Sequence, residues 1–155
     1  MNYWLMKSEP EAFSIDDLAK KTSQTEPWDG VRNYQARNML RDQMKKGDLA
    51  FFYHSNCTPP GIVGVVEIVK EGYPDFSAFE ANSKYYDPAS KPDNPRWFMV
   101  DVQLKQKFKR LISLDELKKN PELQAMQLLR KGNRLSIMPV TAEQWNIIFR
   151  LAEAS

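Results

Sequence analysis

A paired-strand pattern occupies Leu49-Ala50-Phe51-Phe52-Tyr53-His54-Ser55-Asn56-Cys57-Thr58-Pro59-Pro60-Gly61-Ile62-Val63-Gly64-Val65-Val66-Glu67-Ile68-Val69. Both ends of this stretch, residues 49–53 and 62–69, are apolar runs rich in residues that favour β-strands. The polar, proline-containing residues 55–61 between them make a loop longer than a tight hairpin. We therefore predict two neighbouring strands.

Further strands and helices flank this pair. Strands are predicted at residues 3–6, at residues 97–108, where apolar and polar residues alternate, and at residues 134–138. Helices are predicted at residues 15–20, 31–46, 113–119, 122–129 and 141–152, with Ser14 and Asp29 as caps of the first two. Residues 71–96 are proline-rich but also aromatic, which predicts an ordered loop that packs or binds something. This order predicts an α+β fold with a small curled sheet flanked by helices.

The composition is that of one folded domain spanning residues 1–155. The chain has 22 basic and 20 acidic side chains, a net charge of +2, so overall charge is not its binding mechanism. One cysteine and one histidine exclude a disulfide framework and a zinc site built from these residue types. The sequence has no glycine-rich phosphate loop and no apolar run of about 18 residues that would span a membrane. We expect a cytoplasmic protein, or a nuclear one in a eukaryote, with no cofactor, metal or membrane partner.

Basic residues concentrate locally. Residues 32–46 contain five basic side chains and one acid, a local charge of +4. In a continuous helix Arg37, Arg41 and Lys45 would share one face with Asn33, and a polyanion would offset the repulsion between these like charges. A solvated face whose charges are neutralised by acids elsewhere explains the pattern equally well.

The aromatic residues Trp28 and Tyr86 lie in predicted turns or loops and Trp97 opens a predicted strand, and none of the three is on an obvious core-facing period. Stacking a base on such a ring contributes about 1–3 kcal/mol. Any one of these rings, taken alone, is more often a packing residue. Together with the basic stripe, they make nucleic acid or a nucleobase the predicted partner class.

Longer motifs resemble the EVE domain family. They are Tyr3-Trp4-Leu5-Met6-Lys7-Ser8-Glu9-Pro10, Trp28-Asp29-Gly30-Val31-Arg32-Asn33-Tyr34-Gln35-Ala36-Arg37-Asn38, Phe51-Phe52-Tyr53-His54-Ser55-Asn56, Tyr73-Pro74-Asp75, Tyr86-Asp87-Pro88, Pro95-Arg96-Trp97 and Arg134-Leu135-Ser136-Ile137. The resemblance covers essentially the whole chain. It implies a PUA-like fold, a small curled mixed β-barrel flanked by helices, related to the YTH and ASCH domains. It also implies binding of nucleic acid that contains a modified base, in particular a 5-modified cytosine in DNA.

The resemblance and the residue chemistry together predict a site. Lys7 and Ser8 resemble the Lys-Ser that ends the first strand of YTH domains, and Trp28 resembles their first cage tryptophan. Tyr86 or Trp97 is expected to supply the second wall of the pocket. Uncharged groups that could read the edge of the base are Ser8, Asn33, Ser55 and Asn56, and Asp87 could accept from an exocyclic amine. The residues expected to hold flanking phosphates are Arg32, Arg37, Arg41 and Lys45.

The leading hypothesis is a non-enzymatic reader of a modified base in DNA or RNA. One alternative is a small-molecule, nucleotide or protein interaction module that uses the same concave pocket, and salt-insensitive binding would support it. Another is an enzyme acting on a nucleobase with His54 as a proton shuttle. His54 and Cys57 also form a possible nucleophilic pair, but no third residue is marked as its orienting group, so we predict no catalytic residue.

Overall fold

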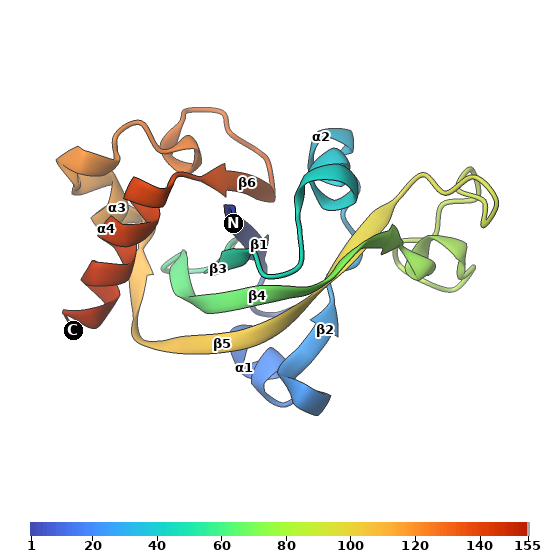
Figure 1. The fold of residues 1–155 in the computed structure, drawn as a ribbon, viewed down its shortest axis with the longest axis horizontal. Helices are drawn as coiled ribbons and strands as arrows, with labels where there is room; N and C mark the ends of the chain where they lie inside the picture. The colour runs from blue at the N-terminus through green and yellow to red at the C-terminus, as the bar shows by residue number, and fades with distance from the viewer. Residues whose placement is uncertain (155) are drawn as a thin grey trace.

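The computed structural model describes residues 1–154. The strands of this part of the chain form one six-stranded mixed sheet (Figure 1). The strands are β1 (Tyr3–Ser8), β2 (Thr25–Pro27), β3 (Leu49–His54), β4 (Gly61–Pro74), β5 (Phe98–Ser113) and β6 (Ile137–Val140), in the order β2-β5-β4-β3-β1-β6. β1 and β3 are parallel, and the other neighbours are antiparallel. The predicted pairing of the two central runs is therefore confirmed, as β3 and β4.

The sheet curls but does not close. β4 and β5 pair with several register shifts, which bend and twist long strands. The sheet still has two edges among the described residues, β2 and β6, so it is not closed into the small curled barrel that the resemblance implied. Both edge strands are short and contain a proline, Pro27 and Pro139, which cannot donate a ladder hydrogen bond. The α+β arrangement of a small mixed sheet with flanking helices is confirmed.

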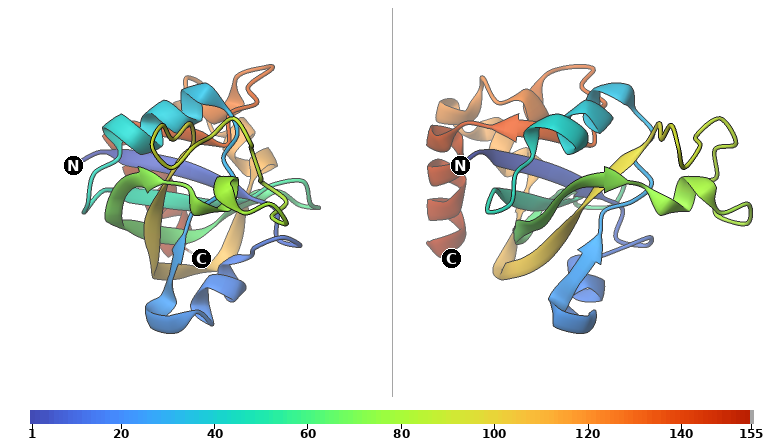
Figure 2. Two further views of the ribbon diagram at one scale, coloured as in Figure 1. Left: turned by 90° about the vertical axis from the view of Figure 1, so that its right-hand side faces the viewer. Right: turned by 45° about the vertical axis from the view of Figure 1, so that its right-hand side comes forward.

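The helices lie around this curled sheet (Figures 1 and 2). They are α1 (Ile15–Ala19), η1 (Thr22–Gln24), α2 (Tyr34–Asn38), η2 (Met39–Gln43), η3 (Phe76–Phe79), α3 (Leu114–Lys119), η4 (Pro121–Leu123), η5 (Gln127–Leu129) and α4 (Ala142–Glu153). α4 packs against the sheet through Trp145, whose ring stacks with that of Phe51 at 3.8 Å and that of Tyr3 at 4.6 Å between centroids. At the opposite end of the molecule, residues 75–97 project from the body; we call them the projecting segment.

The predicted helix at residues 31–46 is wrong in its length and its cap. α2 begins at Tyr34, and the side chain of Asn33, not that of Asp29, accepts from the N–H of Ala36 at 3.0 Å. The chain then continues as one π-helical turn, η2, which shifts the angular position of later residues. The predicted helix at residues 122–129 is likewise two separate turns, η4 and η5, because Met126 adopts extended backbone between them.

Candidate nucleic-acid interface

Arg32 connects the start of α2 to the projecting segment. Its Nη1 donates to Oδ2 of Asp75 at 3.1 Å, and its Nη2 donates to the carbonyl oxygen of Tyr85 at 2.7 Å. The Asp75 side chain is completely buried and also accepts from the N–H groups of Gly30 and Ser77, each at 2.8 Å. A guanidinium that was predicted to hold a phosphate is therefore used inside the fold.

Trp97, one candidate for the second wall of the base pocket, also has its contacts inside the fold. It is 6% exposed, and its Nε1 donates to Oδ2 of Asp87 at 2.6 Å. Its ring stacks with Tyr34 at 4.9 Å, and the Arg32 guanidinium lies 5.3 Å from its centroid. The hydrogen bond from Trp97 lowers the pKa of the Asp87 carboxyl, so this acceptor is ionised and already in use. Tyr86, the other candidate, is 44% exposed.

Gly30 allows the projecting segment to pack closely. Its φ is +78°, and an added Cβ would lie 2.5 Å from Cζ of Tyr85, whereas Gly132 has φ +80° and no neighbouring atom within 4 Å. Both Gly→Ala changes strain the backbone, but only Gly30→Ala also overpacks. We expect Gly30→Ala to lower the free energy of unfolding by about 1–3 kcal/mol more than Gly132→Ala, measured by urea unfolding. Equal losses in the two variants would contradict the contact with Tyr85.

Trp28 lies between β2 and α2 and is 7% exposed. Its N–H donates to the carbonyl oxygen of Val100 at 2.7 Å, and its ring meets Phe52 edge-on at 5.4 Å between centroids. Phe52 pairs with Met6 in the β1–β3 ladder, one residue before Lys7. Trp28 thus packs close to the strand ends where the other pocket residues were predicted, but a base reaches a full face of its ring only after the covering groups move.

The ends of β1 and β3 bring four predicted pocket residues together. Lys7 and Ser8 lie opposite Tyr53 and His54, and the N–H of Ser55 donates to the carbonyl oxygen of Ser8 at 3.0 Å, directly before Asn56. The Lys7 ammonium lies 5.8 Å from the centroid of the Tyr53 ring. Burial lowers the pKa of Lys7 and raises the pKa of Tyr53 to about 12.

Two of these polar side chains can still accept a hydrogen bond from a ligand. The hydroxyl of Ser8 donates to the carbonyl oxygen of Phe13 at 2.6 Å, and the amide Nδ2 of Asn56 donates to Glu9 at 3.2 Å. The serine oxygen can still accept a hydrogen bond, as can the carbonyl oxygen of the asparagine amide.

His54 has a structural role that pH can test. Its Nε2 accepts from the N–H of Ile15 at 3.2 Å, and burial lowers its pKa, so the neutral ring is the form that fits the fold. The unfolded chain then takes up a proton first as the pH falls below about 6.5. Stability conferred by this histidine is present above that pH and is lost below it. We expect urea unfolding at pH 7.5 and 5.5 to show this loss in the wild type, and a smaller loss in His54→Gln, which keeps an acceptor.

The other predicted phosphate ligands have partners within the chain. Arg37 donates to the carbonyl oxygen of Arg96 at 2.7 Å, Arg41 forms two hydrogen bonds to Asp42, and Lys45 lies 4.0 Å from Glu71. Lys45 lies beyond η2, so the continuous basic face predicted for a single helix is wrong. Phosphate binding by these residues stays a prediction, and it would require each of them to share or exchange its present partner.

A polar cleft of about 420 Å³ separates the start of α2 from residues 127–135. Its lining residues are Asn33, Gln35, Gln127, Arg130, Lys131, Gly132, Asn133, Arg134 and Leu135. Three of them are basic, none is acidic, and Asn33 is the one that was predicted for the base pocket. The basic residues were missed because only three lie there, fewer than the five in residues 32–46. The available signal was that residues 123–142 contain three basic side chains and no acid.

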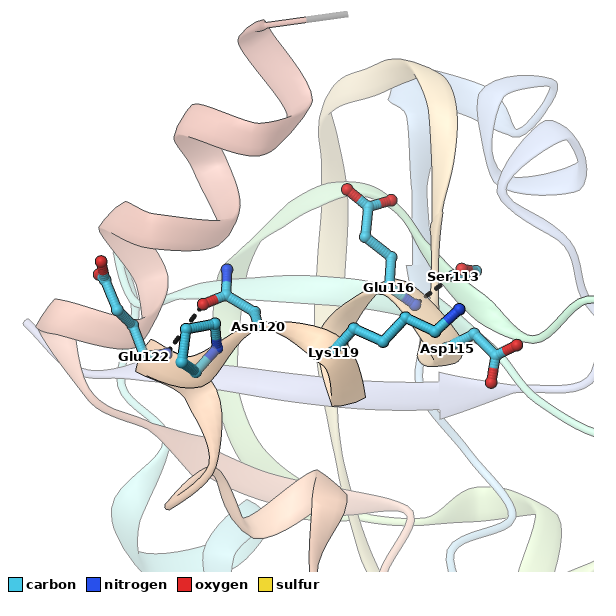
Figure 3. A pocket seen from close by; sticks show the side chains of 7 residues that line it. Ser113, Asp115, Glu116, Lys119, Asn120 and Glu122 are labelled. Atoms are coloured by element: carbon cyan, nitrogen blue, oxygen red, sulfur yellow. Dashed lines mark hydrogen bonds between the residues drawn. The ribbon is translucent and has the colours of Figure 1, made fainter.

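A second cleft, of about 640 Å³, lies beside α3 and η4 (Figure 3). Its lining includes three carboxylates, Asp115, Glu116 and Glu122, against one amine, Lys119. Glu116 pairs with both terminal nitrogens of Arg110 at 2.6 and 2.9 Å, and this pairing lowers the pKa of Glu116. An acidic lining repels a phosphate backbone, so the first cleft is the better candidate for a nucleic-acid interface.

Two kinds of site are absent from residues 1–154. No group of three or more His, Cys, Asp or Glu side chains there is arranged to hold a metal ion. No helix of this part of the chain is long and apolar enough to cross a membrane.

The open sheet, its flanking helices and the polar strand ends match a known class. The EVE domain model matches residues 2–151, and the chain belongs to the EVE domain family. Thymocyte nuclear protein 1 of Rattus norvegicus is 54% identical over 99% of this chain and 74% of its own length. The protein of the same name from Homo sapiens is 51% identical over 98% of this chain and 74% of its own length.

Solved structures share the fold. The human THYN1 protein in complex with 5-methylcytosine-containing DNA has a TM-score of 0.92 and 50% identity, covering 99% of this chain and 98% of that one. A hypothetical protein from Leishmania major has a TM-score of 0.93 and 47% identity, covering 99% and 96%. An ASCH protein from Zymomonas mobilis has a TM-score of 0.56 at 12% identity, covering 97% and 99%, and shows a likeness of fold alone.

Proposed function

We propose that this protein binds DNA and recognises 5-methylcytosine in it, without changing the base chemically. The observation that carries the proposal is its similarity to the human THYN1 protein, which was solved in complex with 5-methylcytosine-containing DNA and shares 50% of its residues. The basic cleft beside α2 supports it, because an acid-free cleft with three cations suits a polyanion.

In the proposed mechanism a flipped base stacks on Trp28, and the strand ends read its edge. Lys7 is half-buried and forms no ion pair among residues 1–154, so its ammonium is available as a donor. The oxygens of Ser8 and Asn56 are available as acceptors. Burying a methyl group contributes about 0.8 kcal/mol, a preference of about fourfold. A larger preference would require a polar group of the site to be left unpaired by plain cytosine.

The test is fluorescence-anisotropy binding of matched oligonucleotides, DNA and RNA, single- and double-stranded. They carry cytosine, 5-methylcytosine, 5-hydroxymethylcytosine or N6-methyladenine at one position. We expect tighter binding of 5-methylcytosine DNA, and in Trp28→Phe a weaker preference with the melting temperature checked in parallel. Tyr86→Ala, which removes an exposed ring, is the matched variant for the second wall. Equal binding of all oligonucleotides by the wild type would overturn the proposal.

An enzymatic function predicts a different outcome from the same mixtures. The His54 imidazole is the candidate proton shuttle, but its Nε2 already accepts from the N–H of Ile15. We expect the mass of a 5-methylcytosine oligonucleotide to be unchanged after prolonged incubation with the protein. A changed mass, lost in His54→Gln, would replace base reading by catalysis.

A small-molecule site is the second candidate function. The cleft of about 420 Å³ falls within the range of ligand pockets, which is roughly 300–1,000 Å³. An uncharged ligand would bind there with little dependence on salt, whereas DNA binding weakens steeply as salt rises.

A further inference from the structure

The basic side chains of residues 127–135 are not neutralised by the fold. Arg130, Lys131 and Arg134 are exposed, and none of them pairs with a carboxylate among residues 1–154. Some basic residues elsewhere pair with acids that lie far away in the sequence, namely Arg32 with Asp75, Lys105 with Glu67 and Lys107 with Asp16, whereas the three cleft residues have no such partner among residues 1–154. A cluster of three unpaired cations repels itself, and a polyanion relieves that repulsion.

The cations surround a cleft that also offers uncharged hydrogen-bonding groups. Gln35, Gln127 and Asn133 line it, and amide side chains donate to phosphate and sugar oxygens. Its lining contains no carboxylate, in contrast to the acidic cleft beside α3. Charge complementarity therefore favours the backbone of a nucleic acid as the occupant.

One wall of the cleft is hydrogen-bonded through its neighbouring residue to the end of β1. The N–H of Lys7 donates to the carbonyl oxygen of Ser136 at 2.8 Å, and Ser136 directly follows Leu135 in the cleft lining. On the other wall, Asn33 ends the connection that begins at Trp28. A strand held in this cleft would therefore lie near the end of β1, where Lys7 and Ser8 are located.

We propose that Arg130, Lys131 and Arg134 are phosphate-binding residues that hold the DNA strand next to the recognised base. This assignment rests on the proposed function and identifies the surface that supplies its sequence-independent affinity. The three residues position the strand and do not discriminate between bases, because phosphates are alike at every position.

The experiment compares two triple variants that remove the same charge. Arg130→Gln, Lys131→Gln and Arg134→Gln remove three cations from the cleft, and Lys109→Gln, Lys118→Gln and Lys119→Gln remove three exposed cations from other surfaces. Binding of 5-methylcytosine and cytosine DNA is measured between about 50 and 200 mM salt, with melting temperatures as the folding control. We expect the cleft variant to bind both DNAs at least ~10-fold more weakly, with a salt slope smaller by about 2–3. Its preference for 5-methylcytosine should match that of the wild type.

The controls separate this assignment from the proposed function. If the wild type prefers 5-methylcytosine DNA but the cleft variant keeps its affinity and salt slope, the phosphate assignment is overturned alone. Equal weakening in both triple variants would assign the effect to net charge and would also overturn it. A wild type that binds none of the DNAs would overturn the proposed function itself.

Discussion

Replacing Asp75 by alanine is expected to destabilise the protein by about 3–5 kcal/mol, because breaking a buried ion pair leaves its partner uncompensated. Asp75 is completely buried, and its carboxylate accepts from Arg32 and from the N–H groups of Gly30 and Ser77. The change leaves a mostly buried guanidinium and two N–H groups without their acceptor. The loss should appear in the midpoint of urea unfolding.

A double-mutant cycle isolates this ion pair. Arg32→Met should destabilise the wild type strongly but cost much less in the Asp75→Ala background, since the partner is already gone. Asp42→Ala is the exposed control, because Asp42 pairs with Arg41 on the surface, and it should cause no measurable change. Additive losses for Arg32→Met and Asp75→Ala would show that the two residues act separately.

The strands were predictable because their apolar patterns are local. β3 appears within one residue of its expected ends, β4 begins one residue early and continues to Pro74, and Ser14 caps the first helix as expected. The closure of the sheet was not predictable, because it depends on whether two distant edges meet. The start of α2 was misplaced because Asp29 and Asn33 are both good caps in sequence, and only the fold selects Asn33.

The site was harder to predict than the strands, since the availability of each side chain depends on partners that lie far apart in the sequence. Arg32 was predicted as a phosphate ligand, but it pairs with Asp75, which lies 43 residues away. Trp97 looked like a free ring, but Tyr34 and Asp87 cover and bind it. Spacing along the chain carries no information on such pairs. The strand-end group of Lys7, Ser8, Ser55 and Asn56 came together because it depends on the β1–β3 pairing.

Trp28 connects the proposed site to the stability of the fold. Trp28→Ala should lower the free energy of unfolding by about 3–5 kcal/mol, as expected for loss of a buried tryptophan. Trp28 is 7% exposed, and its ring packs against Phe52 in the core. Trp28→Phe keeps a flat ring and should cost much less. Tyr86→Ala, at an exposed position, should change stability by no more than about 0.5 kcal/mol.

The measured loss of stability in Trp28→Ala would show how a base can stack on Trp28. A large cost for Trp28→Ala, measured by urea unfolding without DNA, means that the ring is part of the core and that the base must displace covering groups to reach it. Part of the binding energy is then used for this opening, which lowers the measured affinity. A cost below about 1 kcal/mol would contradict the core role, since truncating a packed tryptophan costs more than that. It would mean instead that the ring lies against an open pocket which a base can enter directly.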